Sequence, residues 1–158
     1  MKEKSRKSST QTLGEIGLDN FATYLMNRIA ARYNAQMSEQ ISNLGLNTLK
    51  MRALAVLSII ESPLISELAV YSVTEKSTLS RALDALEEDG LAQRSVDPCD
   101  SRAVRVKITG AGRDVFDGVW PHMFEAYQAM FEGIDDDERH AFIGTLKKLL
   151  RNTKIHDF

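Results

Sequence analysis

Hydroxyl and cationic side chains crowd the start of one short stretch, Glu75 to Gly90. Five such residues follow Glu75 with no carboxylate among them: Lys76, Ser77, Thr78, Ser80 and Arg81. The acidic residues come later in the stretch: Asp84, Glu87, Glu88 and Asp89. A helix that inserts its first turns into the major groove of DNA needs this arrangement, because carboxylates at the tip would repel phosphates. Taken alone, the stretch is explained equally well as an amphipathic helix with a solvated face.

A second set of basic side chains lies in a segment that alternates strictly between apolar and basic residues. The apolar residues are Val104, Val106 and Ile108, and the basic ones are Arg105 and Lys107. This alternation predicts a strand with its apolar side chains inward and one solvated basic face. From the strand pattern alone, we expect Arg105 and Lys107 to contact DNA phosphates.

The loop before this strand has turn chemistry, in the sequence Asp97-Pro98-Cys99-Asp100. Arg102 follows the turn, and arginine is the side chain favoured in a narrow minor groove. Asp100 can pair with Arg102 or with Arg94 and so hold the loop in shape. The alternative is a plain surface salt bridge, which contributes little to stability.

The elements that position these groups follow from hydrophobic spacing. In the first stretch, apolar residues recur at helical intervals before a glycine stop: Leu79, Ala82, Leu83, Leu86, then Gly90. Ser62-Pro63 is a start signal that predicts a short helix from Pro63 to about Tyr71, followed by a turn around residues 72–74. Short helix, turn and longer helix form a helix-turn-helix, and the hairpin over residues 91–108 adds a wing.

Longer helices are predicted on both sides of this module. Before the module, one helix is predicted from Leu18 to about Ile41, and a second from an Asn47 cap to Ile60. After it, a third is predicted from a Thr109 cap to about Phe131, with a kink at Pro121. A last helix follows a capping box formed by Asp135 and Glu138. Their candidate buried positions include Val115, Val119, Met123, Tyr127 and Met130, and then Phe142, Ile143, Leu146, Leu149 and Leu150.

The predicted fold class is mainly α, with a small β-hairpin wing. Residues 46–109 are expected to form the winged helix-turn-helix DNA-binding module. Residues 13–45 and 110–158 are expected to form dimerisation helices, because they are too long to serve the module alone. Residues 1–12 are expected to form a short, disordered basic tail.

Composition bounds the class of protein. With 158 residues and 43% hydrophobic content, the chain can build one domain with a real core. Its 20 Lys and Arg against 22 Asp and Glu give a net charge of −2, so any DNA-binding surface must be local. The single cysteine, the lack of a membrane-length apolar run and the lack of a signal peptide predict a cytoplasmic protein without a membrane partner.

Several segments resemble the MarR (multiple antibiotic resistance regulator) family, over about residues 18–152. Leu46 to Leu57 resembles the family's second helix. Three segments resemble the family's helix-turn-helix: Glu67-Leu68-Ala69, Lys76 to Arg81 and Leu86 to Leu91. Three more resemble the family's wing and the start of its fifth helix: Asp97 to Arg102, Val104 to Ile108 and Thr109 to Gly112. One departure is Ser72-Val73-Thr74, where the family usually has an apolar residue, glycine and an apolar residue.

This resemblance implies a homodimeric repressor that binds a pseudo-palindromic operator in double-stranded DNA. The basic and hydroxyl residues of the first stretch fall where the family touches bases and phosphates. Arg102 falls where the family inserts its wing arginine, and Asp100 where it braces that arginine. Family members often respond to small aromatic acids or phenols. The candidate lining of such a pocket is Tyr24, Arg28, Trp120, His122 and Tyr127, each of which an interface or core position also explains.

The sequence offers little support for a metal site, a redox switch or an enzyme active site. No cofactor or metal is expected, because His122, His140 and His156 have no partner at ligand spacing. A redox switch at Cys99 is a minor alternative, since the peroxide-sensing branch of the family keeps its reactive cysteine near the first helix. Without a phosphate loop, nucleophile elbow or His/Cys cluster, no enzyme is expected. A winged helix that only binds other proteins, and not DNA, remains the main alternative.

Overall fold

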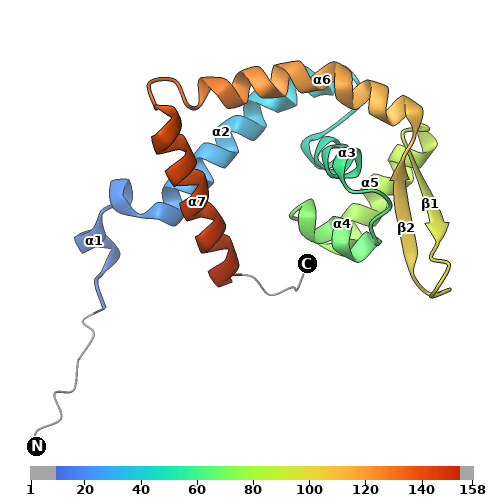
Figure 1. Ribbon diagram of the computed structural model, residues 1–158, viewed down its shortest axis with the longest axis horizontal. Coiled ribbons are helices and arrows are strands. Elements are labelled where there is room, and N and C mark those ends of the chain that lie inside the picture. Colours follow the sequence, from blue (N-terminus) through green and yellow to red (C-terminus); the bar gives the residue numbers. More distant parts are fainter. Residues whose placement is uncertain (1–9, 154–158) are drawn as a thin grey trace, which may run out of the picture. The chain divides into compact units, whose positions relative to one another are not determined.

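The computed structural model describes residues 10–153 (Figure 1). They divide into two compact units, the first ending at Met37 and the second beginning at Ser38. Residues 1–9 of the predicted tail lie outside the described residues, and its last residue, Thr12, caps a helix. Within residues 10–153, no helix has both the length and the apolar character needed to cross a bilayer.

The first unit holds two short helical pieces and most of a long helix. α1 spans Leu13–Ile16, the 3-10 helix η1 spans Leu18–Asn20, and α2 spans Ala22–Ser42. The helix predicted from Leu18 therefore begins at Ala22. Gly17 separates α1 from η1 with a φ of 76°, a value that favours glycine. The carboxylate of Glu15 accepts the Thr12 N–H at 2.7 Å, which completes a capping box around α1.

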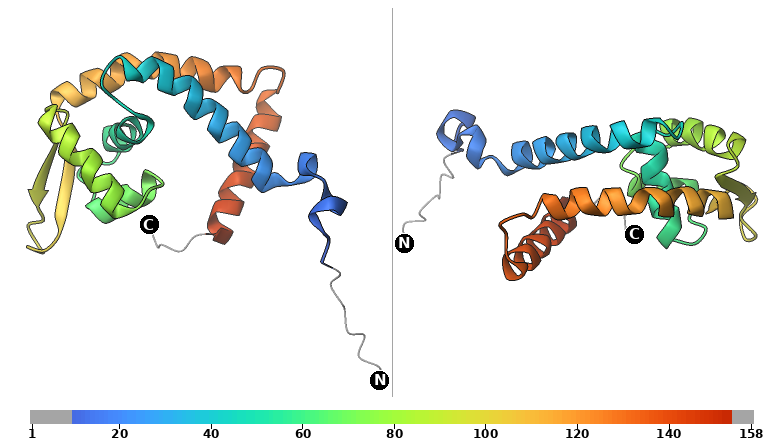
Figure 2. Two further views of the ribbon diagram at one scale, coloured as in Figure 1. Left: turned by 180° about the vertical axis from the view of Figure 1, so that it is seen from behind. Right: turned by 90° about the horizontal axis from the view of Figure 1, so that it is seen from above.

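The second unit contains the helix-turn-helix, its hairpin and the last two helices. In chain order the elements are α3 (Thr48–Ile59), α4 (Ile65–Tyr71), α5 (Lys76–Glu88), β1 (Ala92–Val96), β2 (Val104–Ile108), α6 (Gly110–Ala129) and α7 (Asp136–Thr153). The strands pair antiparallel, with Ala92 opposite Ile108 and Val96 opposite Val104. Figure 2 shows α3, α4, α5 and the hairpin gathered at one end of α6, and α7 leaving from its other end. The predicted mainly α fold with a hairpin wing is confirmed.

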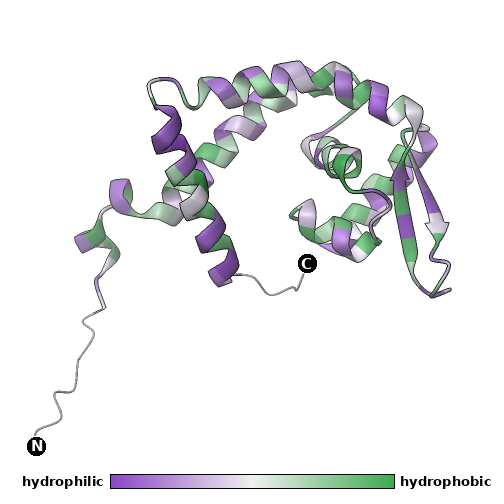
Figure 3. Cartoon of the chain, viewed as in Figure 1, coloured by the Kyte–Doolittle hydropathy of each residue, from purple (hydrophilic) through white to green (hydrophobic). Residues whose placement is uncertain are grey.

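The core of the second unit is built from apolar helix faces and from one strand. Its fully buried side chains include Leu54, Leu68, Leu79, Leu83, Leu86 and Val106. Phe116 and Val119 of α6 belong to the same cluster. The alternating hydropathy of β2 is visible in Figure 3. Because each buried aliphatic side chain contributes roughly 1.5–3 kcal/mol, this core holds α5 and β2 firmly in place.

The connection between α3 and α4 is extended rather than helical. The Pro63 carbonyl accepts a hydrogen bond from the Val106 N–H at 3.0 Å, and Leu64 forms an antiparallel bridge with Arg105. The predicted helix start at Pro63 is therefore wrong, because the backbone there pairs with β2. α4 begins after this bridge, where the Glu67 carboxylate accepts the Leu64 N–H at 2.7 Å.

The other helix ends follow the predicted caps. The cap side chains accept first-turn amides as expected: Asn47 from Lys50 at 2.9 Å, Thr109 from Gly112 at 3.0 Å and Asp135 from Glu138 at 2.8 Å. Gly90 follows α5 with a φ of 71°, as the stop signal predicted. α6 continues through Pro121 but ends at Ala129, so Met130 lies beyond the helix and is 41% exposed instead of buried.

Candidate nucleic-acid interface

The start of α5 presents its polar side chains to solvent because its opposite face is anchored in the core. Leu79, Leu83 and Leu86 on that inner face are fully buried. Among the predicted contact residues, Ser80 is half-buried and four are exposed: Lys76, Ser77, Thr78 and Arg81. The partial positive charge of the helix N-terminus adds to these cations. This tip of α5 can therefore receive an anionic partner.

A hollow of about 240 Å³ joins the tip of α5 to the wing. Lys76 of α5 and Arg102 of the wing loop both line it, together with Asp100. Ser66, in the first turn of α4, adds a hydroxyl to the same hollow. Ser66 was not among the residues predicted from the sequence, because no local pattern shows that the first turn of α4 lines the same hollow as the wing loop. One cation from the tip of α5, Lys76, and one from the wing loop, Arg102, thus lie at the same hollow.

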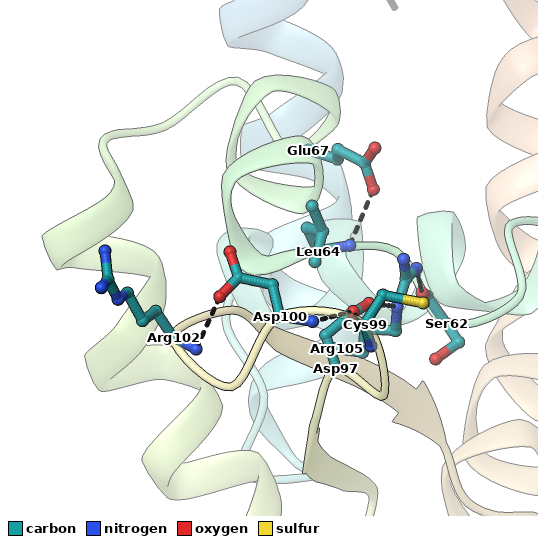
Figure 4. Close-up of polar contacts among 8 residues, drawn as sticks. All are labelled: Ser62, Leu64, Glu67, Asp97, Cys99, Asp100, Arg102 and Arg105. Carbon is teal, nitrogen blue, oxygen red and sulfur yellow. Dashed lines mark hydrogen bonds and ion pairs between the residues drawn. The ribbon is translucent and has the colours of Figure 1, made fainter.

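The wing loop, residues 97–103, is organised around the Asp97 carboxylate. Asp97 is 7% exposed, and its Oδ1 accepts the backbone N–H groups of Cys99 at 2.8 Å and Asp100 at 2.9 Å. Its Oδ2 accepts Nε–H of Arg105 (Figure 4). The hydrogen bond from Cys99, and then that from Arg105, hold the pKa of Asp97 below its ordinary value of 3.8. Asp97 is therefore ionised at neutral pH.

Asp100 shapes the backbone that carries Arg102. Its Oδ1 accepts the Arg102 backbone N–H at 2.9 Å, while Figure 4 shows the Arg102 side chain extending away from the loop. The alternative pairing of Asp100 with Arg94 does not occur. Arg94 instead binds two carboxylates of α5, those of Asp84 and Glu87. Within the described residues, the Arg102 guanidinium is free to bind a ligand.

Arg105 lies in β2 and engages two acceptors of its own chain. Its side chain is 37% exposed, and its guanidinium binds the Asp97 carboxylate and the Ser62 carbonyl, the latter at 2.8 Å. The Arg105 side chain is thus partly solvated but already paired, because alternation fixes the face of a residue and not what a long side chain can reach.

Lys107 is exposed, as predicted, but at a different place from Arg102. Its ammonium lies 3.6 Å from the Glu61 carboxylate, and both groups are solvent-exposed, so this pair contributes little to stability. Lys107 lines another hollow, of about 340 Å³, together with Arg113 of α6.

The candidate effector-pocket residues are divided between the two units. In α2, Tyr24 and Arg28 contact each other, with a guanidinium-to-hydroxyl distance of 3.2 Å. The other three lie on α6. Trp120 and Tyr127 take part in a row of ring contacts that runs along α6 and ends just beyond it, in the order Phe116, Trp120, Phe124, Tyr127 and Phe131. His122 lines a hollow of about 380 Å³ with Gln40 and Asp114.

Residues 10–153 contain no group of three or more His, Cys, Asp and Glu residues that could hold a metal ion. Cys99 is a free, exposed thiol in the wing loop. Its backbone N–H donates to the Asp97 carboxylate. Within residues 10–153, the thiol makes no hydrogen bond to the residues of the candidate interface.

Comparisons with known proteins agree on one family. A model described as MarR family matches residues 44–103. The crystal structure of a MarR-family transcriptional regulator from Silicibacter pomeroyi is 51% identical, has a TM-score of 0.88, and covers 94% of this chain and 100% of that chain. The HTH-type transcriptional repressor IacR of Pseudomonas putida is 25% identical over 122 residues, 77% of this chain and 73% of the repressor. BpsR of Bordetella bronchiseptica shares the fold, with a TM-score of 0.71 at 23% identity over 81% of this chain and 97% of BpsR.

Proposed function

Because this chain belongs to the MarR family of DNA-binding transcriptional regulators, we propose that it is a homodimeric repressor that binds a pseudo-palindromic operator and is released by a small molecule. The family consists of non-enzymatic regulators, and no catalytic activity is assigned. A repressor acts on chromosomal DNA, so the proposal places the protein in the cytoplasm.

The observation that carries this proposal is the hollow shared by Lys76 and Arg102. In the proposed complex, the tip of α5 enters the major groove and Arg102 enters the adjacent minor groove. Ser77, Thr78, Ser80 and Arg81 then face bases and phosphates, and Ser66 adds a phosphate contact. A module that only binds proteins would not need Lys76 and Arg102 at one hollow beside a helix tip free of carboxylates.

The proposed dimer rests on apolar side chains that a single chain leaves uncovered. α7 buries none of its residues, although Phe142, Leu149 and Leu150 are large and apolar, and Leu150 is 70% exposed. Trp120 and Phe124 of α6 are also exposed. Burying such surface against a second copy would stabilise the assembly by roughly 25 cal/mol per Å². Two-fold symmetry would also match a palindromic operator.

The proposed effector is a small aromatic acid or phenol. The candidate lining is the set predicted from the sequence: Tyr24, Arg28, Trp120, His122 and Tyr127. Support comes from BpsR, a neighbour in fold whose DNA binding is regulated by 6-hydroxynicotinic acid.

Two arginine substitutions test the proposed operator complex. We expect Arg102→Ala to weaken binding to all duplexes and to lower the slope of log affinity against log salt by about 1, because the minor groove no longer receives a cation. We expect Arg81→Ala to cost about 1–3 kcal/mol and to relax the sequence preference at one operator position. Fluorescence anisotropy with duplex DNA from upstream of the protein's own gene, over a range of salt concentrations, measures both effects.

The matched control is Lys148→Ala, which removes an exposed cation on α7 and should leave DNA affinity unchanged. If Arg102→Ala left both affinity and salt dependence at wild-type values, the proposed wing contact would be refuted.

A further inference from the structure

The Arg105 guanidinium connects the wing loop to a distant part of the chain. Its Nε–H binds the Asp97 carboxylate, and its Nη1 donates to the Ser62 carbonyl at 2.8 Å. Ser62 lies in the connection between α3 and α4, 43 positions upstream. The planar Arg105 guanidinium therefore links the wing loop to the connection between α3 and α4, two segments far apart in the sequence.

The Asp97 carboxylate transmits this connection into the loop. One oxygen, Oδ2, receives Arg105, and the other, Oδ1, receives the N–H groups of Cys99 and Asp100. Asp100 in turn accepts the backbone N–H of Arg102. An unbroken series of hydrogen bonds thus runs from the Ser62 carbonyl to the backbone of Arg102 (Figure 4).

The backbone of β2 is fastened at the same place. Leu64 forms a bridge with Arg105, and the Val106 N–H donates to the Pro63 carbonyl at 3.0 Å. Ser62 itself has a φ of 54°, a left-handed value that is rare for a residue with a side chain. Strain of this kind persists only where neighbouring contacts fix the backbone. The hydrogen bond from Arg105 to the Ser62 carbonyl is one of the contacts that hold Ser62 in this conformation.

We infer that Arg105 is a positioning residue for DNA binding: acting through Asp97, it fixes the wing loop to the helix-turn-helix so that Arg102 stays beside the tip of α5. This inference rests on the proposed function. It assigns Arg105 a role without DNA contact, in place of the phosphate contact expected from the strand pattern. A two-stranded wing without this bond would be free to tilt in the unbound protein, and binding would have to bring Arg102 back to its position before the same groove contact forms.

Salt dependence separates a positioning role from a phosphate contact. If Arg105 bound a DNA phosphate, Arg105→Leu would lower the salt slope by about 1. A positioning role predicts that Arg105→Leu weakens operator binding by about tenfold, within the range of coupled side chains. The slope stays unchanged, because Arg102 still occupies its groove once the complex has formed. The same anisotropy titration measures both quantities.

Arg105→Lys gives a second distinction. Lysine keeps the charge but lacks the planar fork that serves two acceptors. A positioning role therefore predicts that Arg105→Lys binds nearly as weakly as Arg105→Leu. Binding at the wild-type level by Arg105→Lys would overturn the inference.

Asp97→Asn tests the other side of the pair. The amide keeps one oxygen for the loop N–H groups but turns a donor toward Arg105, so it breaks this connection alone. We expect about tenfold weaker binding, and no further weakening in the double variant Asp97→Asn/Arg105→Lys. Additive effects would contradict a shared role. This variant retains the loop hydrogen bonds, so it decides the question even if Arg105→Leu fails to fold.

Wild-type protein and Lys148→Ala are titrated first on the same duplex. Failure of both to bind would refute the proposed operator binding itself. If both bind and Arg105→Leu lowers the salt slope, the positioning role alone is overturned.

Discussion

At the scale of single residues, the turn between α4 and α5 carries two unfavourable features. Val73 has a φ of 52°, which is strained for a β-branched residue, and it is 77% exposed. The hydroxyl of Ser72 is the one buried side-chain polar atom in residues 10–153 without a hydrogen-bond partner. Arg52 holds the turn from outside, because its guanidinium donates to the Ser72 carbonyl at 2.8 Å. The resembling family usually has glycine at the position of Val73.

We expect Val73→Gly to raise the free energy of unfolding by about 1 kcal/mol. Replacing Val73 by glycine relieves left-handed strain of order 1–3 kcal/mol. Glycine also makes the unfolded chain more flexible, which offsets about 0.5–1 kcal/mol of this stabilisation. Little buried surface is lost, because Val73 is exposed. Urea unfolding at one fixed protomer concentration measures the change. Val73→Ala is the control, since it keeps the Cβ and should gain less. A less stable Val73→Gly protein would show that the turn is not strained.

Sequence patterns located most of the residues at the candidate site but not all of their partners. The tip of α5 and Arg102 could be predicted, because helical spacing and the wing sequence are local. The partners of Arg105 could not, because the Ser62 carbonyl is supplied by a segment 43 positions away. For the same reason the possible pairing of Arg94 with Asp100 is wrong, since the carboxylates that bind Arg94 come from α5.

At the scale of elements, the start of α6 lies directly against the end of the helix-turn-helix. A Cβ placed on Gly112 would lie 2.0 Å from the Leu91 carbonyl oxygen, too close for any side chain. The same carbonyl accepts the Thr109 N–H at 3.1 Å, and the Thr109 hydroxyl donates to the Gly90 carbonyl at 2.7 Å. Glycine at position 112 thus allows α6 to close over the base of the hairpin.

We expect Gly112→Ala to destabilise the protein by at least about 1–3 kcal/mol, because the methyl group meets backbone that cannot move aside easily. Gly110→Ala is the matched control, since a Cβ there meets nothing within 4 Å. Thermal unfolding of the two variants at equal concentration compares them. Equal stability would mean that the contact between α6 and Leu91 is not tight.

Element types were predictable because the helical and strand periods are strong in this chain, as in α5 and β2. Boundaries failed where tertiary contacts override local signals. Ser62-Pro63 is typical of a helix start, yet Pro63 and Leu64 pair with β2 and delay α4. The first long helix, predicted from Leu18, is interrupted at Phe21, whose extended backbone ends η1 and delays the start of α2 to Ala22.

At the scale of the whole molecule, a slightly acidic protein carries a local cationic surface. The net charge is −2, but Lys76 and Arg102 share one hollow, while the acids of α5 lie farther along the helix or, like Glu87, bind Arg94. Because salt screens charges beyond about 10 Å, the local arrangement matters more for groove binding than the total. The exposed apolar faces of α6 and α7 supply the surface for the proposed second copy.

Hydroxyl-radical footprinting of the operator duplex, with protein at saturating concentration, tests the central claim most directly. The wild-type homodimer should protect two symmetric half-sites one helical turn apart and the minor grooves that flank them. Arg102→Ala should lose the flanking protection and keep the central half-sites, since the tip of α5 is unchanged. Identical footprints for the two proteins, or a wild-type footprint without flanking protection, would contradict a single DNA-binding surface made of α5 and the wing.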